Sequence, residues 1–141
     1  MLLSAAFLAA MTSVSAQKLT YVPYADNGYL MGTYISSDGR YIAGGDAGGQ
    51  GFIYDIQNGQ IKYFVSPENG DETKDASTEV RAVNPDGTGV GYVGDKLCKF
   101  DFNTGEYTDL GVNEPALANT MSTDGSVIGG YAWDESTYMQ H

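Results

Sequence analysis

The 141-residue sequence predicts an all-β protein built from consecutive four-stranded antiparallel sheets. An Asp-Gly pair recurs at Asp38, Asp86 and Asp124, each time between short apolar runs. Within these runs apolar and polar residues alternate, which is the period of a half-buried strand. Gly supplies the positive φ that a tight hairpin needs, and Asp accepts hydrogen bonds from the turn backbone. Each Asp-Gly pair is therefore expected to join two strands.

The first unit predicts four strands, at roughly 32–36, 40–44, 51–56 and 60–65. A second unit repeats the pattern, because the run 52–56 aligns with 98–102 and a polar turn carrying Gly follows each run. The same alignment places Val90 in one column with Ile42 and Ile128. The third unit has only its first half.

The predicted organisation is a leader at 1–16 followed by units at 28–66, 79–111 and 114–141, with a further strand at 19–24. The polar stretch 66–78 reads as an insertion, and without it the period of the repeat approaches forty residues. Four strands at this spacing are typical of β-propeller blades.

The chain resembles secreted bacterial β-propeller repeat proteins of the TolB-like (PD40) kind, in which a Ser-Pro-Asp-Gly turn precedes an apolar strand. The run 121–130 is also similar to HAF-type extracellular repeats. The resemblance covers about 28–141 and implies a fold, whereas such blades host many functions. A propeller closes with roughly four to eight blades. Two and a half units therefore imply an incomplete ring, either a fragment of a longer propeller or one of several copies that assemble.

The first sixteen residues are apolar or small, carry no charge and end in Val14-Ser15-Ala16, a pattern that signal peptidase accepts. They predict a signal peptide and a secreted, periplasmic or cell-surface protein. No stretch after residue 16 has the length and apolarity of a membrane span. The unpaired edge of the half unit is expected to promote self-association.

The net charge of −11 disfavours a nucleic-acid partner, because the seven basic residues are scattered and form no basic face. One Cys, Cys98, and one His, His141, cannot supply a zinc site or a His-dependent nucleophile. Cys98 aligns with Phe52 and is expected to be a buried apolar residue. The glycine-rich run 44–51 lacks the Lys of a phosphate loop. We therefore predict no catalytic residue, metal or cofactor.

The predicted ligand-binding residues are those that the repeat places before a first strand or between a second and a third strand, on one rim. They are Tyr29, Asp46, Asp95, Trp133 and Asp134. Aromatic rings and carboxylates suit a neutral or cationic glycan or a peptide from a protein ligand. The sequence thus favours an exported, non-catalytic binding or scaffold protein. The alternative is a fragment of a propeller-fold hydrolase acting on glycans, with carboxylates as acid and base.

Overall fold

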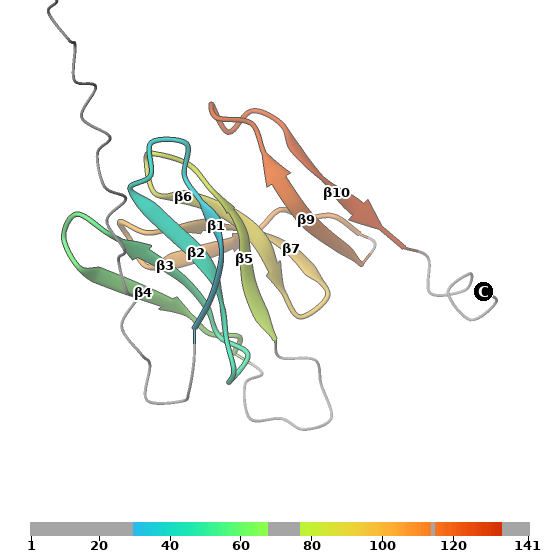
Figure 1. Ribbon diagram of the computed structural model, residues 1–141. Helices are drawn as coiled ribbons and strands as arrows, with labels where there is room; N and C mark the ends of the chain where they lie inside the picture. Colours follow the sequence, from blue (N-terminus) through green and yellow to red (C-terminus); the bar gives the residue numbers. More distant parts are fainter. Residues whose placement is uncertain (1–29, 68–76, 114, 134–141) are drawn as a thin grey trace, which may run out of the picture.

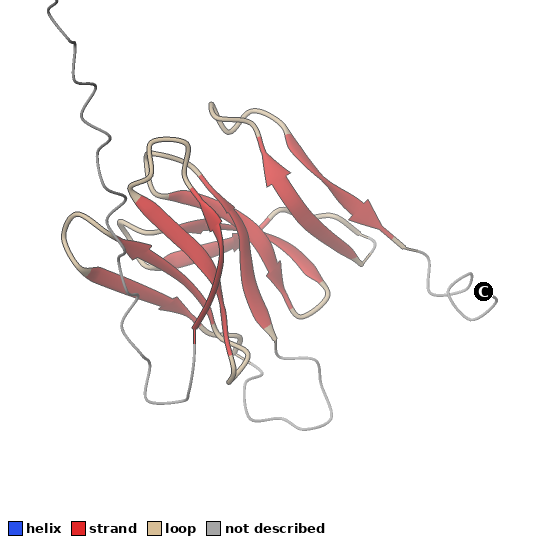
Figure 2. Cartoon of the chain, viewed as in Figure 1, coloured by secondary structure: helices blue, strands red, loops and turns tan. Residues whose placement is uncertain are grey.

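The computed structural model describes residues 30–67, 77–113 and 115–133, and every regular element in these ranges is a β-strand (Figures 1 and 2). The strands are β1 Leu30–Ile35, β2 Tyr41–Asp46, β3 Gly51–Asp55, β4 Gln60–Phe64, β5 Thr78–Val83, β6 Thr88–Val93, β7 Lys96–Asp101, β8 Glu106–Asp109, β9 Ala116–Met121 and β10 Ile128–Ala132. The all-β prediction is confirmed for the described chain. The predicted strand at 19–24 lies outside it.

Three antiparallel sheets follow one another along the chain. The first has the order β1-β2-β3-β4, the second β5-β6-β7-β8, and β9 pairs with β10 in a third. The four strands of the first unit begin and end within two residues of the predicted positions. Each sheet is a meander whose neighbours in sequence are neighbours in space.

The Asp-Gly turns of all three units share their glycine conformation and their Asp hydrogen bond, and they lie at the same end of the sheets (Figure 1). Gly39, Gly87 and Gly125 have φ values of 72°, 84° and 71°. In each turn the Asp carboxylate accepts the N–H of the residue two positions later, at 2.8–3.1 Å. These contacts bear out the hairpin chemistry that the repeat predicts.

The second unit has a tighter turn than the other two, and this changes its register. Asn84 donates its N–H to Thr88, four residues on, whereas Ser36 donates to Tyr41, five residues on. Val90 therefore corresponds to Ala43 and not to Ile42, as the sequence alignment had it. Both Val90 and Ala43 are completely buried.

The sheets stack so that each uses opposite faces for its two neighbours. The register puts Ala43, Ile53 and Phe64 on one face of the first sheet. This face meets Cys98 and Phe100 of the second sheet. The residues of the first sheet that correspond to them in the repeat are Phe52 and Tyr54, and these lie on the opposite face of the first sheet. The rings of Phe64 and Phe100 meet edge to face, with centroids 5.0 Å apart. β5 contacts β1, β2 and β3, and β9 contacts β5, β6 and β7 in the same way.

A backbone hydrogen bond repeats at each junction between sheets. Thr78, at the start of β5, donates its N–H to the carbonyl oxygen of Gly49, in the β2–β3 turn, at 2.7 Å. Ala116, at the start of β9, donates to Asp95, in the β6–β7 turn, at 3.2 Å. The second and third sheets are thus attached to their predecessors by the same relationship.

β3 differs from the expected half-buried strand, because all five of its residues are buried. Ile53 faces the second sheet, which has four strands. Lys99, at the equivalent position of β7, lies on the face toward the third sheet and is exposed. The alternation prediction holds for β7 and is wrong for β3. No helix in the described part of the chain is long and apolar enough to cross a membrane.

Candidate functional site

The first strand of every sheet carries a β-bulge at the same position. The pairing of β1 with β2 skips Thr33, that of β5 with β6 skips Arg81, and that of β9 with β10 skips Asn119. A bulge leaves one residue outside the regular ladder and re-aims its side chain, a device that recurs beside functional sites. The three skipped residues occupy equivalent places in the repeat, and all three are polar.

A glycine on the second strand permits each bulge. A Cβ added at Gly44, Gly91 or Gly130 would collide with the carbonyl oxygen of a first-strand residue. Those residues, Met31, Glu79 and Leu117, also correspond to one another in the repeat. The backbones of the first two strands therefore approach closely at the bulge, which only Gly allows.

A groove of about 340 Å³ lies where the first strands and the Asp-Gly hairpins of neighbouring sheets meet. Its lining includes Tyr34, Arg81 and Asn119 from β1, β5 and β9, and Ser37, Asn84 and Thr123 from the turns. We call it the bulge groove. Its volume falls within the range of small-molecule sites, about 300–1,000 Å³. Among its described lining residues, Arg81 is the one charged side chain and no carboxylate is present.

Arg81 is held in place by three neighbours. Its Nε donates to Oε2 of Glu79 at 3.0 Å, and its Nη1 donates to Oδ1 of Asn119 at 2.9 Å. The guanidinium carbon lies 5.0 Å from the centroid of the Tyr92 ring, and the Tyr92 hydroxyl donates to Glu79 at 3.1 Å. These contacts fix the guanidinium before any ligand arrives, which lowers the entropy cost of binding.

The charge of Arg81 is secure at all ordinary pH values. Burial disfavours its charged form, but the hydrogen bond and ion pair with Glu79 outweigh burial and raise the pKa of Arg81 above its usual value. Both side chains keep about a quarter of their surface exposed. Arg81 is therefore a permanent cation at the side of the groove, in hydrogen-bond contact with Glu79.

Three of the predicted rim residues, Asp46, Asp95 and Trp133, lie at the opposite end of the sheets, where the β2–β3 and β6–β7 turns are found (Figure 1). Asp46 is buried, and its Oδ1 accepts the N–H groups of Gly48 and Gln50 at 2.9 and 2.8 Å. Asp95 is exposed, and Trp133 is partly buried with its ring 5.9 Å from that of Tyr131. Asp46 thus shapes its own turn, while Asp95 and Trp133 remain accessible.

Tyr29 and Asp134 lie outside the described residues. The structure brings Asp46, Asp95 and Trp133 to the same end of successive sheets. It also reveals Arg81 and Asn119, which the sequence reasoning did not single out. A signal for them is present in the sequence. Ile35, Val83 and Met121 hold the same place before the three Asp-Gly pairs, and the residue two positions before each of them is polar.

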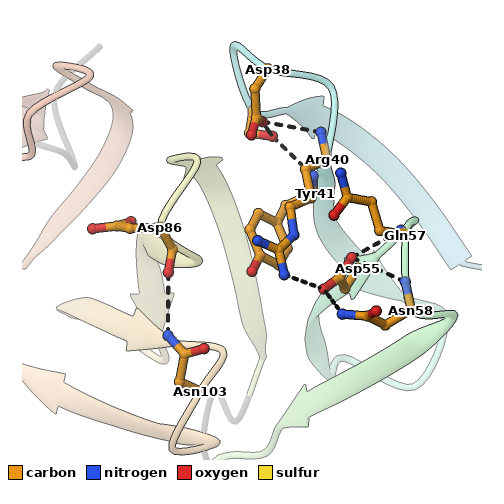
Figure 3. A network of polar contacts seen from close by, with 9 residues as sticks. Asp38, Arg40, Tyr41, Asp55, Gln57, Asn58, Asp86 and Asn103 are labelled. Carbon is orange, nitrogen blue, oxygen red and sulfur yellow. Dashed lines mark hydrogen bonds and ion pairs between the residues drawn. The ribbon is translucent and has the colours of Figure 1, made fainter.

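A second polar cluster, at Asp55, supports the fold rather than a ligand (Figure 3). Nη2 of Arg40 and Nδ2 of Asn58 donate to Oδ2 of Asp55 at 2.9 and 2.8 Å, and the N–H groups of Gln57 and Asn58 donate to Oδ1. Burial alone would raise the pKa of Asp55, but these bonds prevail and lower it. The carboxylate is completely buried and joins the two hairpins of the first sheet.

The described residues offer no arrangement for nucleophilic or metal chemistry. Cys98 is buried, and desolvation raises the pKa of its thiol to about 11, so little thiolate forms near neutral pH. No group of three or more metal-ligating side chains occurs among the residues that the structure describes. The bulge groove can bind a ligand through the fixed guanidinium of Arg81 and through the side-chain amides and hydroxyls that line it.

Comparisons with protein-family models, curated proteins and solved structures found no match to this chain. By its fold, the described chain is a stack of antiparallel β-sheets, joined by repeated contacts, with a polar groove between their first strands.

Proposed function

We propose that this chain is an exported, non-catalytic binding or scaffold protein of the β-propeller type, and that the bulge groove takes its ligand. Three equivalent bulges on three first strands carry this proposal. At two of these bulges the skipped residue, Arg81 or Asn119, lines the groove, and the two side chains hydrogen-bond to each other across neighbouring sheets. Export rests on the leader-like residues 1–16.

The propeller assignment is supported by the constant sense of stacking. Each new sheet packs through the same face on the same three strands of its predecessor, so further units added in the same way would turn around the first strands. In such an arrangement β1, β5 and β9 lie innermost and the bulge groove opens at the centre.

The alternative, a hydrolase fragment acting on glycans, receives less support. Glycoside hydrolysis uses two carboxyl groups on either side of the scissile bond. No carboxylate lines the described part of the bulge groove, and Glu79 beside it is engaged by Arg81 and Tyr92. A binding role fits these residues better.

The experiment is a screen of the purified chain against immobilised glycans and peptides, repeated with Arg81→Gln. Lys62→Gln is the matched control, because Lys62 is an exposed cation on β4, away from the groove. We expect a ligand whose signal falls with Arg81→Gln and is kept by Lys62→Gln. Release of new reducing ends from a bound glycan would instead support the hydrolase.

A further inference from the structure

We infer that the bulge groove selects a neutral, hydroxyl-rich ligand, a glycan without acidic groups, and that Arg81 orients it. This inference rests on the proposed binding function and names its ligand class. Three independent features of the groove lead to it: the hydrogen-bonding inventory of Arg81, the charge beside it, and the mixture of donors and acceptors in the lining.

The guanidinium of Arg81 keeps donors for a ligand. Its five N–H groups form a planar fork, and Glu79 and Asn119 take one each. Asn119 accepts through Oδ1, so its amide nitrogen is still a donor. The bulges thus bring a guanidinium edge and an amide donor from neighbouring sheets to one side of the groove.

The charge of Arg81 is already balanced. Glu79 accepts from Nε at 3.0 Å, so a ligand carboxylate bound to the same guanidinium would lie close to a second carboxylate. Like charges at such a distance disfavour binding of an anion. The net charge of −11 acts in the same direction. A neutral acceptor, such as a sugar hydroxyl or ring oxygen, uses the free N–H groups without this penalty.

The remainder of the lining suits groups that both donate and accept. Tyr34, Ser37 and Thr123 supply hydroxyls, and Asn84 places its amide at the junction by donating to the carbonyl of Ser122 at 3.1 Å. A hydroxyl acts as donor and acceptor at once, as these lining groups do. Tyr34 also packs against the hydrophobic core, which holds its side chain at the edge of the groove.

The test measures binding of two matched sets of probes to the full chain by calorimetry. One set contains neutral oligosaccharides (cello-, malto-, manno- and chito-oligosaccharides), and the other contains oligogalacturonides of the same length. We expect a neutral member to bind with an affinity that changes less than about twofold between 50 and 500 mM NaCl, because screening affects charged partners. No oligogalacturonide should bind more tightly than that neutral oligosaccharide.

Two variants locate the site. Arg81→Gln should lower the affinity for the neutral ligand about tenfold or more, because the hydrogen bonds from a charged donor are lost. Asn119→Ala removes an exposed side chain together with its hydrogen bond to Arg81 and should weaken binding of the neutral ligand severalfold. Lys62→Gln and the rim variant Asp95→Asn should bind as the unaltered chain does.

The outcomes separate this inference from the function on which it rests. Tighter, salt-sensitive binding of oligogalacturonide, or neutral binding that Arg81→Gln and Asn119→Ala leave unchanged, would overturn the inference while binding itself stands. Capture of a peptide alone would do the same. If no glycan or peptide binds at millimolar concentration, the proposed function falls together with the inference.

Discussion

Gly44 on β2 lies so close to Met31 on β1 that a Cβ at Gly44 would overlap the carbonyl oxygen of Met31. The same relationship joins Gly91 to Glu79 and Gly130 to Leu117. The bulges, and with them the polar column in the first strands, therefore depend on glycine at one position of each second strand.

Gly44→Ala should destabilise the protein by about 3 kcal/mol, at the upper end of what overpacking a buried site costs. Gly45→Ala, one residue further along the strand, is the matched control. Its added Cβ would meet the nearest atom, the carbonyl oxygen of Thr78, at an ordinary 3.5 Å. The control should change the free energy of unfolding by less than about 1 kcal/mol. Urea titrations followed by circular dichroism measure the free energy of unfolding of both variants. Equal losses of stability would refute the close approach of Gly44 to the carbonyl oxygen of Met31.

Asp55 should make the free energy of unfolding depend on pH in the acid range. Its pKa is lowered in the folded protein, so its contribution is complete above the ordinary value of 3.8 and is lost as the pH falls through the folded pKa. Asp55→Asn should therefore lower stability at pH 6 by roughly 1–3 kcal/mol and have a smaller effect at pH 2.5. Unfolding free energies of both proteins at several pH values measure this.

Asp101→Asn is the control for this prediction, because Asp101 holds the equivalent turn by accepting the N–H of Asn103 at 2.8 Å but is only partly buried. Asp101→Asn should lower the free energy of unfolding at pH 6 by less than Asp55→Asn does. A loss from Asp55→Asn that is the same at pH 6 and pH 2.5 would show that the buried ion pair with Arg40 does not form.

Cys98 should resist thiol reagents while the protein is folded. Its side chain is 1% exposed and its pKa is raised to about 11 by burial, so both access and thiolate are scarce at pH 8. Labelling with Ellman's reagent should be slow in buffer and complete within seconds in 6 M guanidinium chloride. Comparable rates in the two conditions would place Cys98 outside the core between the first two sheets.

The turns were the most predictable part of this fold, for a local reason. Asp38, Asp86 and Asp124 make the same hydrogen bond two residues ahead, and the following Gly has positive φ in each case. These properties depend on neighbouring residues only, so the sequence pattern identifies them. The four-stranded order follows from them, because each turn joins adjacent antiparallel strands.

The features that the sequence did not predict depend on pairing between strands. The tighter turn at Asn84 shifts one register by a residue, which no composition rule reveals. The bulges at Arg81 and Asn119 are set by the pairing of β5 with β6 and of β9 with β10, although the polar residues themselves recur in the sequence. The candidate site was therefore expected on the rim, where loops vary, and not on the first strands.

One stacking relationship repeats from sheet to sheet. Through-hydrogen-bond scalar couplings in the labelled protein test it most directly, at the two junctions where Thr78 donates to Gly49 and Ala116 donates to Asp95. We expect a coupling at each junction, together with slow exchange of both amide protons. A coupling from Thr78 or Ala116 to any other carbonyl, or fast exchange of both amides in the folded protein, would contradict it.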